Sequence, residues 1–198
     1  GTGPWRGQDH FDQAGAGQLP WLQTPKRREA SEWLLIDAAT RDSLEITRSA
    51  QGARAGSLLS AVDRTVTGAG ARMLSADLSA PLADMGAVND RLDLVNWLAE
   101  QGSQRADLRD ILAALPDIGR ALGRIVAGRG SPRDLGALRD GLDGARTLRE
   151  KLAEREEVPA LLSRLLPTLD GHGALVDELA RALVPAPPTE AASGGYIA

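Results

Sequence analysis

The glycine-rich segment 123–130 comes nearer than any other part of the sequence to a phosphate-binding loop. Gly123 and Gly128 have the spacing of the two glycines in a P-loop, where backbone N–H groups bind nucleotide phosphates. However, Arg129 stands where the phosphate-binding lysine belongs, and Gly130 stands where a magnesium-binding hydroxyl belongs. The segment also follows a predicted helix rather than a strand. We therefore interpret it as a glycine-rich helix end.

Other residue patterns that carry catalysis or metal binding are missing from the sequence. His10 and His172 are the only histidines, and neither has a second histidine or a carboxylate cluster at ligand spacing. The absence of cysteine excludes disulfides, thiolate zinc sites and a cysteine nucleophile. Gly15-Ala16-Gly17 lacks the third glycine of a dinucleotide-binding fingerprint. We expect no catalytic, cofactor-binding or metal-binding residue in this chain.

Charged side chains gather on one predicted helix and at the start of the next. Asp117, Arg120 and Arg124 share a helix face at positions i, i+3 and i+7, and Arg133 and Asp134 follow in the next helix. One interpretation is a network of ion pairs between adjacent helix ends. The other is an interdomain contact that transmits movement. Both stay open, and we take Arg120, Arg124, Arg133 and Asp134 as candidate structural or coupling residues.

The composition predicts that a mainly helical chain positions these residues. The chain has 198 residues, of which 42% are hydrophobic and only 3% aromatic, so its core must consist of Leu, Ala, Val and Ile. Such a core favours helices over sheets. The net charge of −4 argues against the strongly basic surface of a self-sufficient nucleic-acid-binding protein. No apolar run approaches the roughly 18 residues that span a bilayer, so we expect no membrane partner.

Apolar periodicity predicts several helices after Ser57, separated by proline and glycine. The clearest helix start is Ser131-Pro132-Arg133-Asp134, with a serine cap, proline at the first helical position and an acid at the third. Apolar residues then recur at helical spacing up to Leu152. The other predicted helices lie around residues 58–62, 73–78, 84–98, 108–115, 118–128, 158–166 and 174–184.

The beginning of the chain has a different character. Residues 1–31 contain five Gly and three Pro, which is typical of a loop or linker. Beyond them, Trp33-Leu34-Leu35-Ile36 is a short apolar run and Leu44-Glu45-Ile46-Thr47 alternates with period two. These two stretches predict a small β element near residues 33–47. Because the first residue is Gly rather than Met, we expect a piece of a longer protein.

Several short blocks along the chain occur in an order that is typical of one family. The blocks are IDAATR (36–41), LEIT (44–47), GSLL (56–59), DRTVT (63–67), GARML (70–74), PL (81–82), RLD (91–93), SPRDL (131–135), PP (187–188) and GGYIA (194–198). Together they resemble the first part of the core, or lever, domain of the MutS DNA mismatch repair proteins, before the clamp insertion. Gly68 and Ala69 depart from the pattern, since the family usually has Pro-Met there.

This resemblance implies a division of the chain and a role for it. Residues 1–31 would be the end of the connector region, and residues 32–198 the first part of the core domain, truncated before the clamp and ATPase domains. The parent protein would bind mismatched double-stranded DNA and ATP with Mg, as a homodimer and a DNA-dependent ATPase. This segment would be the helical lever that couples the DNA clamp to the ATPase, and no residue of the family's ATP site is found in it.

The resemblance also implies a MutL-like partner protein and a bacterial, cytoplasmic location near the nucleoid. Two alternatives remain open from the sequence. The first is a stand-alone helical interaction module without a link to nucleotide or DNA. The second is a MutS paralogue that acts in recombination rather than in mismatch repair.

Overall fold

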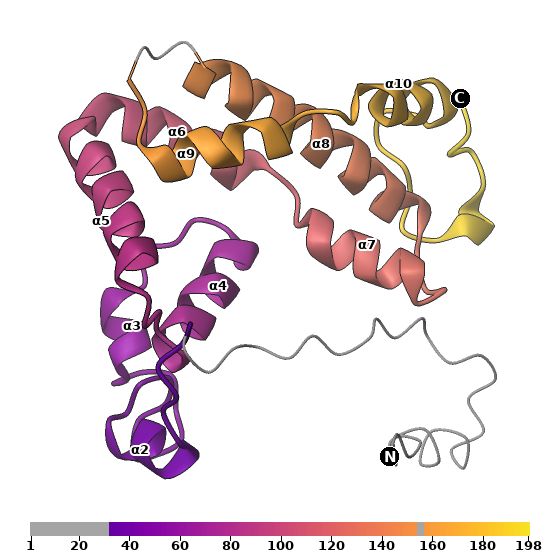
Figure 1. Cartoon of the computed structure of the whole chain (residues 1–198). Coiled ribbons are helices and arrows are strands. Elements are labelled where there is room, and N and C mark those ends of the chain that lie inside the picture. The colour runs from indigo at the N-terminus through magenta and orange to yellow at the C-terminus, as the bar shows by residue number, and fades with distance from the viewer. Residues whose placement is uncertain (1–31, 154–156) are drawn as a thin grey trace, which may run out of the picture.

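The computed structural model describes residues 32–153 and 157–198, and within these ranges it contains helices and no strand (Figure 1). The predicted mainly helical class is therefore confirmed. None of the described helices is long and apolar enough to cross a membrane. The elements are α2 Ala38–Ser43, α3 Leu58–Val62, α4 Gly68–Ser79, α5 Met85–Glu100, α6 Gly102–Ala114, α7 Ile118–Val126, α8 Pro132–Ala153, α9 Ala160–Leu165 and α10 Gly173–Ala182, with 3-10 turns η1 Leu166–Leu169 and η2 Ala191–Ser193.

Side-chain caps explain where several of these helices begin. Asp84 accepts a hydrogen bond of 2.8 Å from the backbone N–H of Ala87 and so begins α5. Thr67 Oγ1 accepts one of 2.9 Å from the N–H of Gly70. Because of this cap, α4 begins at Gly68 although glycine there supplies no preset φ.

The predicted β element near residues 33–47 is wrong, because residues 38–43 form helix α2. Asp37 accepts a hydrogen bond of 2.9 Å from the N–H of Thr40, and this cap starts the helix. Glu45 has a φ of +49°, in the left-handed region, which interrupts any extended run. Ile46 is buried, so the alternation in sequence reflects one core residue just beyond a helix end.

A single antiparallel bridge remains where a sheet was expected, and it joins Trp33 to Leu82. The N–H of Leu34 donates to the carbonyl of Pro81 at 2.7 Å, and the N–H of Ala83 donates to the carbonyl of Glu32 at 3.0 Å. The bridge ties the start of the described chain to the loop between α4 and α5.

The molecule has a larger and a smaller part, and α8 is the central helix of the larger one. Helices α6, α7 and α10 and the 3-10 turn η1 all pack against it (Figure 1). Leu108 of α6, Leu152 of α8 and Leu162 of α9 form its buried apolar cluster, with Trp97 of α5 packed on it. Burying a leucine side chain stabilises a fold by about 1.5–3 kcal/mol. The cluster anchors the C-terminal end of α8.

Glycines on α8 let neighbouring segments approach its backbone closely. A Cβ atom on Gly141 would overlap Cγ2 of Ile118, the first residue of α7. A Cβ on Gly136 would lie 3.1 Å from the ring of Pro187. The side chains of α7 and the C-terminal segment therefore occupy space that any larger residue on α8 would fill.

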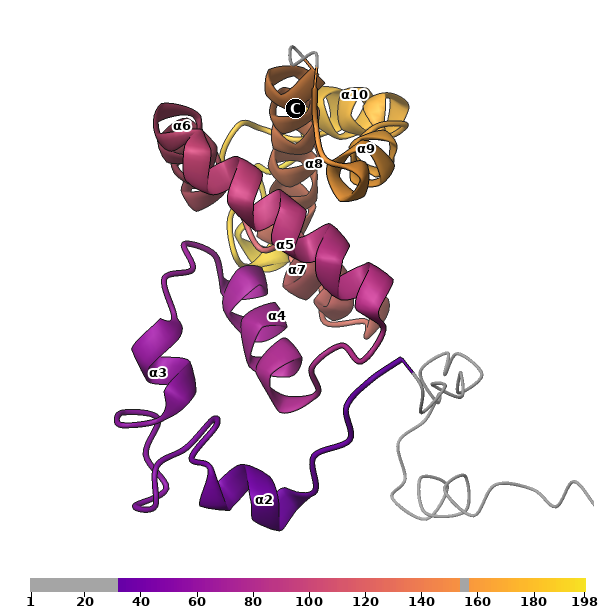
Figure 2. The same cartoon turned by 60° about the vertical axis from the view of Figure 1, so that its left-hand side comes forward.

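Helices α2 to α4 form a smaller part, which α5 joins to the larger one (Figure 2). Ile46 and Leu59 are buried within it. Arg91 of α5 pairs with Asp77 of α4 at 2.7 Å. Helix α4 is thus attached to α5 by a charged contact.

Candidate functional site

Asp134 closes the N-terminus of α8 and is buried, with 5% of its surface exposed. Its Oδ2 accepts hydrogen bonds of 2.9 Å from both the backbone N–H and the hydroxyl of Ser131. In return, the hydroxyl oxygen of Ser131 accepts a bond of 3.3 Å from the N–H of Asp134. This reciprocal arrangement is a capping box and satisfies donors that the helix start would otherwise leave unpaired.

Arg124 of α7 reaches across to the same carboxylate. Its Nε donates to Oδ1 of Asp134 at 2.9 Å, and Nη2 makes a second bond to that oxygen. The Arg124 hydrogen bonds hold the pKa of Asp134 far below its usual value of 3.8, and the Ser131 bonds lower it further against the effect of burial. Asp134 is therefore ionised, and both of its oxygens are occupied.

Asp117, the N-cap residue of α7, is engaged by a helix distant in sequence. Arg72 of α4 donates to its two oxygens at 2.8 and 2.9 Å, and the backbone N–H of Arg120 donates at 3.2 Å. The Arg72 bond is the largest cause of a lowered Asp117 pKa. The Arg120 side chain lies farther away, with its Nε 3.6 Å from Oδ2 of Asp117.

The structure thus joins two of the four candidate residues, Arg124 and Asp134, and leaves the other two outside that pair. Arg133 is exposed, and its backbone N–H donates to the carbonyl of Pro188 at 3.0 Å. The ion pairs of the described ranges include neither Arg133 nor Arg129. Their guanidinium groups are available to another molecule or segment.

An open cavity of about 540 Å³ lies between α7 and the start of α8. We call it the arginine groove, because Arg120, Arg124, Arg129 and Arg133 line it, together with Asp117 and Asp134. Planar guanidinium groups bind carboxylates and phosphates through paired hydrogen bonds. The groove can therefore bind an anionic group.

Sequence reasoning missed two members of this site. Arg72 lies 45 residues before Asp117, and no local spacing links them. The sequence pattern presents Arg129 only in the place of a P-loop lysine. The predicted helix end indicates that Arg129 is exposed after α7. The distance between Arg129 and Arg133, however, depends on the angle between α7 and α8.

The segment 123–130 is the helix end that the sequence predicted. Gly128 has a φ of +69°, and its N–H donates to the carbonyl of Ile125 at 2.9 Å. Because the carbonyl end of a helix carries partial negative charge, it repels phosphates. These residues do not fit the phosphates of ATP.

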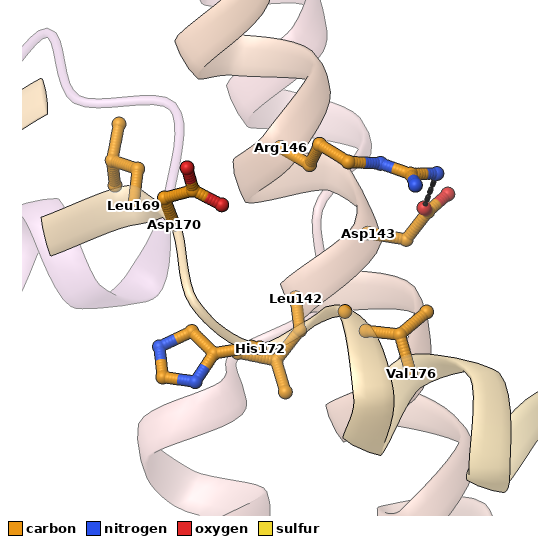
Figure 3. Close-up of a pocket in the computed structure, with 8 residues that line it drawn as sticks. Leu142, Asp143, Arg146, Leu169, Asp170, His172 and Val176 are labelled. Carbon is orange, nitrogen blue, oxygen red and sulfur yellow. Dashed lines mark hydrogen bonds and ion pairs between the residues drawn. The ribbon is translucent and has the colours of Figure 1, made fainter. Parts of the chain in front are cut away.

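His172 lies beside a small cavity of about 40 Å³ between α8 and α10 (Figure 3). Its imidazole points away from Asp143 and Arg146, which pair with each other at 2.5 Å (Figure 3). A cavity of this size holds about one or two water molecules. No group of three His, Asp or Glu side chains that could hold a metal ion occurs in residues 32–153 or 157–198. His10 and Gly15-Ala16-Gly17 lie outside the described residues.

Fold and site together define a helical segment with an arginine-lined groove. Residues 39–198 match the family model of MutS domain III. The chain belongs to the MutS family. It is 56% identical over 188 residues to the DNA mismatch repair protein MutS of Zymomonas mobilis, and 58% identical over 189 residues to that of Erythrobacter litoralis. The corresponding protein of Cereibacter sphaeroides is 47% identical over 190 residues.

These similarities extend over nearly the whole chain but only part of each relative. They cover 95% and 96% of this chain and 22% of the Zymomonas and Erythrobacter proteins. The chain therefore spans about a fifth of the length of the curated relatives that it matches.

Proposed function

We propose that this chain is the helical lever of a DNA mismatch repair protein that binds mismatched double-stranded DNA and ATP. The match to MutS domain III and the names of the relatives support this proposal. Residues 32–198 would be the first part of the core domain, and residues 1–31, which lie outside the described ranges, would end the connector region. The names of the relatives favour mismatch repair over a paralogue acting in recombination.

The observation that carries the lever role is the continuity of α8 through 22 residues. A helix of that length spans about 33 Å and moves as a stiff body. The arginine groove lies at its N-terminal end, and the buried apolar cluster lies at its C-terminal end. A displacement of one end of α8 would therefore also move its other end.

Exposed apolar residues on α5 favour a segment of a larger assembly over a stand-alone module. Met85, Leu92 and Val95 are 71%, 52% and 59% exposed, and they share one helix face. Exposed apolar side chains on one helix face favour an interaction site. Further parts of the parent protein would cover it.

In this proposal, ATP and Mg bind in the rest of the parent protein, where hydrolysis also takes place. The parent would act as a homodimer and pass its signal to a MutL-like protein. It would work in the bacterial cytoplasm, beside the nucleoid. The lever would link the nucleotide state to the position of the DNA clamp.

The variant Arg133→Ala in the full-length parent tests this role. We expect its affinities for ATP and for mismatched DNA to stay within about twofold of wild type, because Arg133 would act between the two sites. ATP-triggered release of DNA should slow by about five- to tenfold, within the usual range of coupling energies. Stopped-flow fluorescence of labelled DNA measures that rate. Arg109→Ala is the matched control, since Arg109 is exposed on α6 outside the groove. Unchanged release in Arg133→Ala would contradict a coupling role for this residue.

A further inference from the structure

The arginine groove concentrates positive charge on a chain whose net charge is −4. Four arginines line it against two aspartates, Asp117 and Asp134. Arg72 adds a further cation at its edge through its bonds to Asp117. Like charges repel, so an accumulation of this kind costs free energy unless an anion offsets it.

The two aspartates of the groove are already occupied and offset little of the remaining charge. Both oxygens of Asp134 accept bonds from Arg124 and Ser131. Asp117 is engaged through both oxygens by Arg72. Among the arginines that line the groove, Arg129 and Arg133 take part in none of the described ion pairs, and Arg120 has only a 3.6 Å contact with Asp117.

A more apolar cavity adjoins the groove. Its volume is about 340 Å³, and it shares Ser131 with the groove. Ile125, Leu135 and Tyr196 are among the residues that line it. An occupant of both cavities would place carboxylates among the arginines and one apolar side chain beside them.

We propose that the arginine groove docks a short acidic segment of the same polypeptide, from outside residues 1–198, with an apolar side chain in the adjoining cavity. The inference rests on the proposed function, since it requires a parent protein longer than this chain. The relatives supply that length, because the chain covers 22% of the Zymomonas and Erythrobacter proteins. Carboxylates suit the groove because guanidinium groups bind them through paired hydrogen bonds.

Duplex DNA fits the groove less well than an acidic protein segment does. A protein that follows a DNA backbone typically neutralises about 6–10 phosphates along an extended basic surface. Here the basic surface is a single cavity in which Arg129 and Arg133 take part in none of the described ion pairs. On the next turns of α8, Asp140 and Asp143 pair with Arg139 and Arg146. The arginines on these turns are therefore already paired and do not extend the basic surface of the groove along α8.

Photo-crosslinking in the full-length parent tests the inference. The variant Thr189→p-benzoylphenylalanine places the crosslinker on the groove wall and leaves every arginine in place. After irradiation, mass spectrometry identifies the captured peptide. We expect a peptide of the same chain, outside residues 1–198, with at least two Asp or Glu residues within about five positions. Mixing isotope-labelled and unlabelled protein distinguishes capture within one chain from capture between copies.

Charge reversal provides the second readout. Adding Arg129→Glu and Arg133→Glu should lower the crosslink yield at least fivefold. The control pair Arg109→Glu and Arg181→Glu changes the same net charge on exposed positions outside the groove and should leave the yield within twofold. Capture of DNA, of a second copy, or of no peptide would overturn the inference, as would a yield that the groove variants leave unchanged.

The outcomes also separate this inference from the proposed lever role. If no acidic segment is captured while Arg133→Ala still slows DNA release, docking is wrong and the lever role stands. If the segment is captured while release is normal, docking stands and the coupling role is wrong.

Discussion

At the residue scale, Asp134 serves two elements at once. It closes the first turn of α8 through Ser131 and holds α7 through Arg124. Its carboxylate is buried, while the Arg124 side chain is 48% exposed. A buried carboxylate with every oxygen bonded is costly to protonate, which makes the local fold sensitive to acid.

We expect Asp134→Asn to reduce the pH dependence of stability. The pKa of Asp134 is lower in the folded chain than its usual value of 3.8, so its stabilisation is complete above about pH 5 and is lost as the pH falls through the folded pKa. At pH 7 the variant should be less stable by about 0.5–2 kcal/mol, as for other lost caps. Urea unfolding at pH 7, 5, 3 and 2 measures both effects.

The expected pattern is a gap between wild type and Asp134→Asn that narrows below about pH 4. Asp177→Asn, at an exposed carboxylate of α10, should follow the wild-type curve. Parallel curves for wild type and Asp134→Asn would show that the Arg124 pair does not stabilise the folded chain.

At the scale of elements, α7 packs closely against α8 because Gly141 of α8 has no side chain. Gly141 is buried against Ile118, whose branched Cγ2 cannot move without rotating the whole side chain. Gly144 faces a terminal methyl of Leu115, which is more easily displaced. A Cβ atom on Gly123 of α7 would meet open space.

These three glycines predict a graded response to alanine. Gly141→Ala should destabilise the chain by about 1–3 kcal/mol through overpacking, despite the better helix propensity of alanine. Gly144→Ala should cost less. Gly123→Ala should stabilise by about 0.5–1 kcal/mol, because alanine there gains propensity without a clash. Thermal unfolding followed by circular dichroism ranks the three, and a stabilising Gly141→Ala would contradict the packing described for α7.

At the scale of the whole molecule, two parts meet through α5 and through charged contacts of α4 (Figure 2). The apolar cluster of the larger part is built from α5, α6, α8 and α9 with neighbouring residues. Arg72 and Asp117 join α4 to the start of α7 beside the arginine groove. Exposed ion pairs of this kind contribute little free energy and are weakened by salt. The contact between α4 and the start of α7 should therefore weaken as the salt concentration rises.

We expect Arg72→Ala to loosen α4 without unfolding α8. Amide hydrogen exchange in α4 should become about two- to fivefold faster, the range expected for one exposed ion pair, and exchange in α8 should not change. Arg120→Ala is the control, because its side chain lies 3.6 Å from Asp117 while Arg72 bonds both oxygens. Equal exchange in α4 of wild type and Arg72→Ala would show that the Arg72–Asp117 pair does not hold α4 against the larger part.

The sequence by itself determined the features that depend on contacts between residues a few positions apart. Caps such as Asp84 and Ser131, and prolines such as Pro81 and Pro116, set helix boundaries through hydrogen bonds or steric clashes with the adjacent turn. The mainly helical class follows from the composition. The ordered blocks were sufficient to recognise the MutS family, which the match over residues 39–198 confirms.

The tertiary structure alone decided which distant residues meet. The strand predicted around Ile46 is wrong, because alternation does not distinguish a strand from one buried residue after a short helix. The bond from Arg72 to Asp117 joins residues 45 positions apart, and the arginine groove forms where α7 turns into α8. Such contacts depend on how helices pack, and packing depends on side-chain volumes at many positions at once, which no local spacing encodes.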